Sequence, residues 1–425
     1  MQESIDKVIP SGRWLHIIPP TILVYIVAFM DRTNIGFAMA GGMSKDLAMT
    51  ASVTGLAAGI FFVGYLFLQV PGGQIAEKGS AKKFIACSIM AWGGLAVISG
   101  FVQNVPQLLA IRFLLGVAEG GVWPAILTII SHWFPNEERG RANAYFIMNV
   151  PIASIITGPL SGWIITVYSW RAVFIIEGLI SLALILVWLP LISDRPEDAK
   201  WISKEEKEYI TQKIKEEQKN VKDKEGTAVS LKDIFSNINM WKLIVIYFCY
   251  QTGIYGFSLW LPTLIKELTK SGMNGVGWLS TLPYVGTIVG LYVFSHLSDK
   301  SGNRKLHTAL PLIGFSICLL LSVQTKSSIW LSFAFLIGCG VFLQAASSVF
   351  WTIPPILFNT EMAGGARGVI NALGNLGGFL GPYIVGWLTM KYSSGIGTYS
   401  LVIILAIGFL VTVSLPKETS KSEGL

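Results

Sequence analysis

The chain has 425 residues, of which 52% are hydrophobic and only 13% are charged. Soluble proteins carry about 25% charged residues, so this composition excludes an ordinary soluble domain and indicates a polytopic membrane protein. The formal net charge of +7 is explained by basic loops beside a membrane, and we expect no nucleic-acid partner.

Apolar segments of bilayer-spanning length, about 20 residues each, fill most of the chain. After a short polar start, the first six predicted spans lie at about 17–40, 52–76, 84–102, 106–131, 142–167 and 171–192. The next six are predicted at about 240–263, 275–297, 307–324, 328–357, 366–390 and 396–415. The sequence therefore predicts an all-α polytopic membrane protein with about twelve transmembrane helices in two six-helix bundles.

One long polar segment divides the two sets of spans. Residues 193–238 are rich in Lys and Glu and predict a cytoplasmic linker between an N-terminal bundle, 1–192, and a C-terminal bundle, 239–425. Within the linker, the mixed charges of residues 200–225 are typical of an amphipathic surface helix that leads into a flexible segment. We expect this part to act as a solvated tether between the halves.

The distribution of Lys and Arg predicts the orientation of the chain. Short connections on the side of the termini contain Lys7, Arg13, Lys78, Lys82, Lys83, Arg139, Arg141, Lys300, Arg304, Lys305, Arg367, Lys417 and Lys421. The opposite loops contain only Lys45, Lys266, Lys270, Lys326 and Lys391. Because cytoplasmic loops are enriched in Lys and Arg, we expect a multi-pass protein of the cytoplasmic (inner) membrane with both termini in the cytoplasm.

The two halves of the chain echo each other. Residues 77–83 and 299–305 both place an acidic residue beside a Lys, with a second basic pair a few residues later. Gly-Pro followed by Gly-Trp occurs at residues 158–163 and again, at nearly the same offset, at 381–387. Two unrelated patterns at one offset indicate duplication of a six-helix unit. Paired halves with a site between them at mid-membrane are typical of transporters.

Two pairs of charged residues interrupt the apolar spans. Asp31 and Arg32 lie in the first span, and Arg112 and Glu119 lie in the fourth. Charges inside a membrane are costly, so a chain keeps them where they pair, face a watery cavity or perform work. Arg112 and Glu119 are nearly two helical turns apart and therefore share one face, about 10 Å apart along the axis. We expect all four side chains to line one central cavity and to couple a proton to an anion.

Each of these residues also has a structural alternative. Arg32 stays charged at any accessible pH and can bind a carboxylate with two parallel hydrogen bonds, which predicts a substrate contact; the alternative is a structural pair with an acid. Adjacent helical residues point about 100° apart, so Asp31 is not expected to contact Arg32. Asp31 and Glu119 are the candidate proton sites, or else members of two permanent ion pairs. We expect Arg112 to be a partner of one of these acids rather than of the substrate.

These residues carry a family resemblance. The chain resembles a major facilitator superfamily transporter over essentially its whole length. Its loops at 77–83 and 299–305 are similar to that superfamily's cytoplasmic motif, although Glu77 and Ser80 replace the commoner Asp and Gly. A narrower resemblance is to the anion:cation symporter family, which includes bacterial carriers for galactonate, hexuronate and other sugar acids, tartrate and aromatic acids. It rests on residues 31–34, 112–119 and 170–174.

The resemblance implies roles for particular residues. Members of the family with this pattern use acids at the positions of Asp31 and Glu119 as proton sites. They contact sugar acids at the positions of Tyr65, Ser348, Trp351 and Asn371. Phe29 stands where sugar-acid carriers of this type can have Tyr, a departure that weighs slightly against a hydroxyl-rich substrate.

Further polar residues are candidates from their position in the spans alone. Gln251, Tyr255 and Asn149 can hydrogen-bond or stack on a small solute, whereas core packing and interhelical hydrogen bonds are the commoner roles of polar residues in membrane helices. Glu177 is the third acid within a span, and we expect it near the outer surface in a structural pair with Arg171.

These patterns predict a secondary active transporter, and not an enzyme, that imports a small organic monocarboxylate of the sugar-acid type by proton symport through alternating access. The alternatives are a carrier of an aromatic or dicarboxylic acid and a membrane ligand sensor that does not transport. No Ser-His-Asp arrangement, phosphate-binding Gly loop or metal-ligand spacing is visible, so we expect no metal and no cofactor. The expected partners are the substrate, protons and the lipid bilayer, and the expected state is a monomer.

Overall fold

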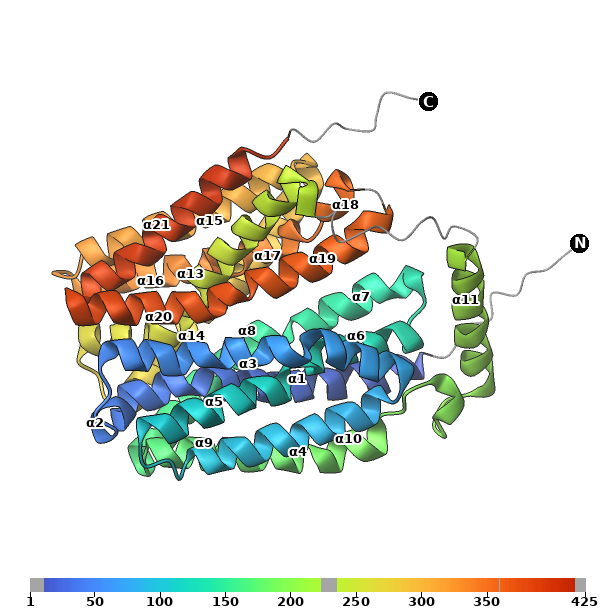
Figure 1. Cartoon of the computed structure of the whole chain (residues 1–425), viewed down its shortest axis with the longest axis horizontal. Helices are drawn as coiled ribbons and strands as arrows, with labels where there is room; N and C mark the ends of the chain where they lie inside the picture. The colour runs from blue at the N-terminus through green and yellow to red at the C-terminus, as the bar shows by residue number, and fades with distance from the viewer. Residues whose placement is uncertain (1–10, 223–234, 359, 417–425) are drawn as a thin grey trace, which may run out of the picture.

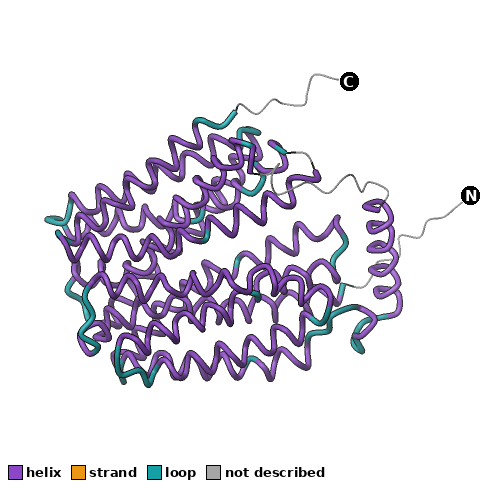
Figure 2. Tube along the Cα trace, in the orientation of Figure 1, coloured by secondary structure: helices purple, strands orange, loops and turns teal. Residues whose placement is uncertain are grey.

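The computed structural model describes residues 11–222, 235–358 and 360–416, without the side chains of 218–222 and 360–365, and nearly all of these residues are helical. The last part of the predicted tether, 223–234, lies outside the described residues, as do the basic residues Lys7, Lys417 and Lys421. Figure 2 shows the helices joined by short loops.

A first group of helices comes from the N-terminal half of the chain. Its elements are α1 (Gly12–Ala38), η1 (Met39–Met43), α2 (Ser44–Asp46), α3 (Ala51–Lys78), α4 (Ala81–Ser99), α5 (Val105–Gly120), α6 (Val122–Trp133), α7 (Asn136–Ile147), α8 (Asn149–Val167), α9 (Trp170–Ala183) and α10 (Ile185–Leu191). The 3-10 helix η2 (Pro196–Asp198) and the helix α11 (Lys204–Lys222) follow.

A second group comes from the C-terminal half. Its elements are α13 (Ile238–Thr269), α14 (Met273–Ser301), α15 (Arg304–Gln324), α16 (Ile329–Leu343), α17 (Ala345–Phe350), α18 (Pro354–Leu357), α19 (Thr360–Gly374), α20 (Leu376–Lys391) and α21 (Ser394–Val413).

Eleven helical segments of the described chain are long and apolar enough to cross a membrane. The remaining predicted span, 366–390, falls on α19 and α20, which meet at a break around Asn375. The predicted all-helical membrane fold is therefore confirmed. The observed helices extend beyond the predicted apolar segments, and the first begins at Gly12, because hydropathy marks the part of a helix in lipid and not its polar ends.

The two groups of helices lie side by side (Figure 1). Near one end, helices of one group pack closely against helices of the other. Gly55 of α3 approaches α20 so closely that an added Cβ would collide with the Pro382 carbonyl. Between α8 and α14, a Cβ on Gly277 would collide with the Gly158 carbonyl. Glycine is needed at both crossings because it lets two helix backbones touch. We call the end where these crossings lie the opposite end, because it is far from the start of α1. The end that contains the start of α1 is called the terminal end.

The α11 helix packs on the terminal end of the first group, so the expectation of a solvated tether is wrong for this helix. Arg13, at the start of α1, is buried between two acids: its Nη1 lies 2.7 Å from Glu206 Oε1 and its Nη2 lies 2.7 Å from Glu138 Oε1. The ring of Trp201, just before α11, stacks on His16 with centroids 4.0 Å apart. The charge pattern indicated a surface helix, but its partners on α1 and α7 are distant in sequence.

Candidate functional site

Arg32 lies in the second half of α1 and is only 4% exposed. Its Nη2 donates a hydrogen bond to Glu119 Oε2 across 3.2 Å, which forms a buried ion pair between α1 and α5. Its Nη1 donates a long hydrogen bond of 3.5 Å to the Tyr255 hydroxyl on α13. Arg32 therefore joins an acid of the first helix group to a hydroxyl of the second.

Aromatic rings surround the Arg32 guanidinium. Its Cζ lies 4.8 Å from the ring centre of Tyr65 and 5.1 Å from that of Phe61. Tyr25 and Phe29 supply two more rings, at 5.9 and 5.7 Å. These distances are within reach of cation–π attraction. The structure thus brings Tyr65 next to Arg32, and Phe29 belongs to the same shell without offering a hydroxyl.

Arg112 and Glu119, the two charges of α5, are held differently. Arg112 is buried and donates to three backbone carbonyls, those of Ala57, Asp31 and Arg32, at 3.3 to 3.5 Å. It donates to the backbone carbonyl of Asp31 and not to its carboxylate. Arg112 therefore links α5 to the backbone of α1 beside the Arg32–Glu119 pair. Glu119 Oε1 is buried and has no hydrogen-bond partner, which leaves half of that carboxylate unused.

The carboxylate of Asp31 binds α9 and not Arg32, as the angle between neighbouring helical residues predicts. Asp31 Oδ2 accepts a hydrogen bond of 2.6 Å from the Ser181 hydroxyl. Asp31 Oδ1 is buried without a hydrogen-bond partner. Asp31 therefore lies beside the Arg32–Glu119 pair but belongs to a different hydrogen-bond network.

Glu177 is placed differently from the prediction. The expected pair with Arg171 is wrong, because Arg171 Nη1 donates to two backbone carbonyls between α4 and α5, at 3.2 and 2.6 Å. Glu177 is buried within the first group, where Oε2 accepts from Asn34 Nδ2 at 2.9 Å and Oε1 accepts from Ser161 Oγ at 2.8 Å. Six residues on a helix correspond to about 240° of rotation, so Arg171 and Glu177 face different neighbours.

A second polar cluster lies in the other group of helices. Gln251 Nε2 donates to Asn375 Oδ1 at 2.8 Å, and Asn375 Nδ2 donates to Asn371 Oδ1 at 3.2 Å. The Tyr247 hydroxyl also donates to Asn371 Oδ1, at 3.4 Å, and the Tyr247 ring lies 4.9 Å from that of Trp351. Three predicted substrate residues are thus brought together by uncharged partners.

Two predicted site residues belong to neither cluster. Ser348 is exposed on α17, and its hydroxyl donates to the carbonyl of Ala345 one turn earlier. Asn149 is buried at the start of α8, and its Nδ2 donates to the nearby Phe146 carbonyl. Both bonds are local to the chain, so nothing in these contacts links the two residues to Arg32.

Sequence reasoning did not single out Ser181, Asn375, Tyr25, Phe61 or Tyr247. Ser181 carries a usable signal, because it follows Glu177 on α9 by four positions and therefore shares its face. Asn375 follows Asn371 by the same spacing but lies at the break between α19 and α20. Tyr25, Phe61 and Tyr247 carry no comparable signal, since aromatic residues are common throughout membrane helices. Within the described chain, no group of three His, Cys, Asp or Glu side chains is placed to hold a metal ion.

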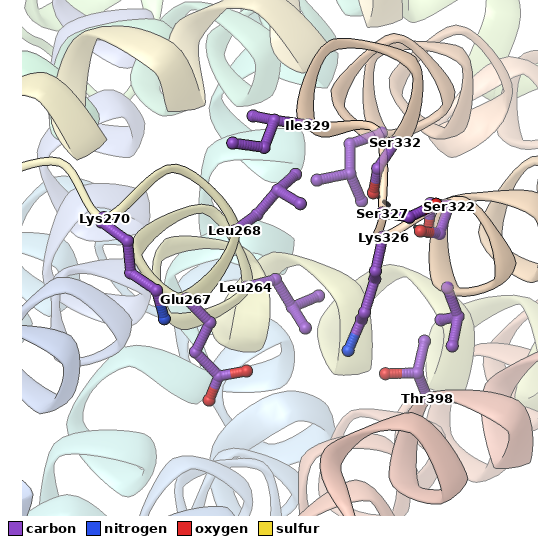
Figure 3. Close-up of a pocket in the computed structure, with 12 residues that line it drawn as sticks. Leu264, Glu267, Leu268, Lys270, Ser322, Lys326, Ser327, Ile329, Ser332 and Thr398 are labelled. Atoms are coloured by element: carbon purple, nitrogen blue, oxygen red, sulfur yellow. Dashed lines mark hydrogen bonds between the residues drawn. The ribbon is translucent and has the colours of Figure 1, made fainter.

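A pocket of about 540 Å³ is lined by other residues than those of the two clusters, and Figure 3 shows its lining side chains. It lies at the opposite end of the second group, between the end of α13 and the connection from α15 to α16. Glu267, Lys270 and Lys326 line it together with apolar and hydroxyl side chains. None of the predicted site residues belongs to its lining, so this pocket is separate from the candidate site.

Comparison with known proteins identifies the family. The sequence pattern of the Major Facilitator Superfamily matches residues 21–382 and 267–424. The chain is 32% identical over 420 residues to the "Putative tartrate transporter" of Agrobacterium vitis, covering 96% of this chain and 95% of the relative. It is 31% identical to the "Quinolone resistance transporter" of Acinetobacter baumannii, with 93% and 92% of the two chains covered.

A more distant relative and a solved structure agree with this result. The "Probable galactarate/D-glucarate transporter GudP" of Bacillus subtilis (strain 168) is 24% identical, with 98% and 95% of the two chains covered. The crystal structure of a bacterial homolog to the human lysosomal transporter Spinster shares the fold, with a TM-score of 0.77 at 15% identity over 95% of this chain and 98% of that one. The matches cover nearly the whole chain and concern transporters, not enzymes. This multi-pass membrane protein belongs to the Major Facilitator Superfamily.

Proposed function

We propose that this protein imports a small organic acid, a sugar acid with one carboxylate, together with one or more protons. The observation that carries the proposal is the incomplete use of Arg32. Its Nη2 meets a single oxygen of Glu119, and its Nε is buried without a hydrogen-bond partner. A guanidinium offers a fork of parallel donors that fits a carboxylate, so Arg32 has donors to spare for an anion. The names of the tartrate and galactarate/D-glucarate relatives also support an organic acid.

Competition for one guanidinium provides the coupling. When Glu119 is ionised, it holds Arg32, and an incoming anion has to displace it. A proton on Glu119 removes the attraction between the two side chains and frees the fork for the substrate carboxylate. Loss of the proton on the other side of the membrane restores the Glu119–Arg32 pair and expels the anion. Arg32 has an anionic partner both in the empty state with ionised Glu119 and in the loaded state, and the cost of leaving its buried charge unpaired favours binding of the anion once Glu119 is protonated.

The second group of helices contributes recognition without charge. Tyr255 reaches Arg32 from α13, so an anion bound at Arg32 lies where the two groups meet. The amides of Gln251, Asn371 and Asn375 offer donors and acceptors suited to sugar hydroxyls. We infer that residues 1–192 and 239–425 rock about this contact, as paired halves do in alternating access.

A dicarboxylic acid is the second candidate, because two relatives carry names of dicarboxylates. A second carboxylate needs a second set of donors. Arg112 is a second buried cation beside Arg32, and each of its three nitrogens donates to a backbone carbonyl. That engagement favours a substrate with one carboxylate.

The test compares solutes that differ in one group. D-galactonate and galactarate share the hydroxyls of the carbons between their ends and differ at the last carbon, which carries a primary alcohol in D-galactonate and a second carboxylate in galactarate. Benzoate represents an aromatic acid. The unfolding temperature of the purified protein should rise most with D-galactonate. A ligand at 100 times its dissociation constant adds about 2.7 kcal/mol to the free energy of unfolding. Counterflow of the labelled solute in liposomes then separates a carrier from a sensor. A larger rise in unfolding temperature with galactarate or benzoate would mean that the substrate is a dicarboxylic or an aromatic acid. Binding without counterflow would contradict transport.

The orientation is part of the same proposal. The excess of Lys and Arg at the terminal end supports a cytoplasmic position for that end. Reporter fusions at the C-terminus and within α11 should both report cytoplasmic. An external signal from either fusion would reverse the assigned direction of transport.

A further inference from the structure

The buried acid Glu177 has no part in the mechanism above, yet it shares a helix contact with Asp31. Helices α1 and α9 meet through two hydrogen bonds, from Ser181 to Asp31 and from Asn34 to Glu177. We call these four residues the α1–α9 seam. Because Asn34 follows Asp31 by three residues, Glu177 lies about 5 Å closer to the opposite end than Asp31 does.

Neither acid of the seam forms an ion pair with any side chain that the structure describes. Asp31 and Glu177 are each only 1% exposed. A carboxylate without a counter-ion in the membrane interior is costly, and a bound proton removes that cost. Two carboxylates about one turn apart also repel when both are ionised. A proton bound to one of these two carboxylates is therefore favoured.

The surroundings of Glu177 offer no other described titratable partner. From α8 it receives the Ser161 hydroxyl, and from α1 it receives the Asn34 amide. Helix α4 approaches α9 through the backbone of Val97. Arg171 on α9 itself is bound to carbonyls. Asp31 is the ionisable group that faces Glu177 across the seam.

The Ser181 hydroxyl can form hydrogen bonds both when Asp31 is ionised and when Asp31 is protonated. Ser181 Oγ lies 2.6 Å from Asp31 Oδ2 and 3.0 Å from the Glu177 backbone carbonyl oxygen, but a hydroxyl has a single hydrogen. It donates to Asp31 when that acid is ionised, and it accepts from Asp31 and donates to the carbonyl when Asp31 carries a proton. Asp31 Oδ1 and Asn34 Oδ1 are both buried acceptors without a donor, as expected where a proton has room to bind.

We propose that Glu177 holds the transported proton before Asp31 does. Glu177, Asp31 and Glu119 then form three successive proton positions from the opposite end towards the centre of the first group. In the step between the first two, the O–H bond of Glu177 breaks, an O–H bond forms on Asp31, and the negative charge passes from Asp31 to Glu177. This inference rests on the proton coupling proposed above.

The test is an infrared titration of the full chain in lipid nanodiscs without any solute. The measured signal is the carbonyl stretching band of protonated carboxyl groups, which ionised carboxylates do not give. Wild type should show a band that changes with pH, and Glu177→Gln should lose part of it. Asp31→Asn should move the pH at which the Glu177 band changes, because the neighbouring charge is gone.

A matched control comes from the terminal end. Glu206→Gln also removes a buried acid, but one paired with Arg13, and it should leave the band unchanged. If Glu177→Gln does not fold, Glu177→Asp keeps the carboxyl and should shift the frequency of the band.

Two results would overturn the inference. One is a wild-type band that neither variant at position 177 affects, and the other is a Glu177 band that stays constant at every pH and in Asp31→Asn. Since no solute is present, these results concern Glu177 alone. Failure of the proposed function is detected separately, by counterflow and accumulation in liposomes.

Discussion

Arg13 and Arg32 are buried arginines of the same helix, and their partners differ in a way that supports a structural role for Arg13 and the proposed substrate-binding role for Arg32. Arg13 donates through Nε and Nη2 to Glu138 and through Nη1 to Glu206, at 2.7 to 3.1 Å. Arg32 has one carboxylate oxygen at 3.2 Å, one hydroxyl at 3.5 Å and an unpaired Nε. Both arginines are buried, so burial does not distinguish them, and it is the unoccupied donor of Arg32 that supports the proposed role in substrate binding.

Arg32→Lys should have the largest effect on function. A lysine ammonium is a point charge and cannot reproduce the planar fork, so the loss of charge-assisted hydrogen bonds costs about 1.5 to 3 kcal/mol. We expect D-galactonate binding to weaken about 10- to 100-fold in the thermal-shift assay, with little change in the unfolding temperature of the free protein. Undiminished binding would place Arg32 in the same structural class as Arg13.

Glu119→Gln and Asp31→Asn should separate coupling from binding. Each variant mimics one protonation state permanently, so both should lose accumulation driven by a pH gradient. At least one of them should retain counterflow, since exchange needs the loaded carrier to reorient but no net release of protons. The assays are run in parallel in liposomes on variants checked for folding. Full pH-driven accumulation in both would mean that the two acids are structural, like Glu206.

Arg13→Ala should act on stability and not on transport. Removing the guanidinium leaves two acids without a counter-ion, at a cost of about 3 kcal/mol, the lower value for breaking a buried pair. The matched control is Arg139→Ala, whose pair with Glu217 is 29% and 28% exposed and should cost less than about 1 kcal/mol. Chemical denaturation measures both, and counterflow per folded molecule should be unchanged. Equal losses of stability would show that the Arg13 site is no more structural than a surface pair.

Tyr255→Phe should give the smallest effect and the finest test of how the two groups meet. The variant keeps the ring, which lies 4.2 Å from that of Phe62, and removes only the hydroxyl that reaches Arg32. A single weak hydrogen bond is worth about 0.5 to 1 kcal/mol, so we expect a two- to fivefold weaker apparent affinity in counterflow. An unchanged affinity would mean that recognition by the second group does not pass through this hydroxyl.

Much of the fold and part of the site could be predicted from the sequence. The predicted spans and the buried charges at Asp31, Arg32, Arg112 and Glu119 agree with the helices and burial observed. These features follow from single residues or short segments, because the cost of placing a charge or a polar backbone in lipid is local. Tyr65 was chosen as a substrate contact from family resemblance and not from any such rule, and its position beside Arg32 is a finding of the structure.

Pairing was decided only by tertiary structure. Arg32 and Glu119 are 87 residues apart, and Asn34 and Glu177 are 143 residues apart. Which carboxylate meets which donor depends on how α1 crosses α5 and α9, and those crossings are set by the packing of side chains from both helices. The sequence by itself determined that Glu177 is an acid within an apolar span and that α11 carries mixed charges. It did not determine that Glu177 bonds to Asn34 and Ser161, or that Arg13 holds α11 against the first group.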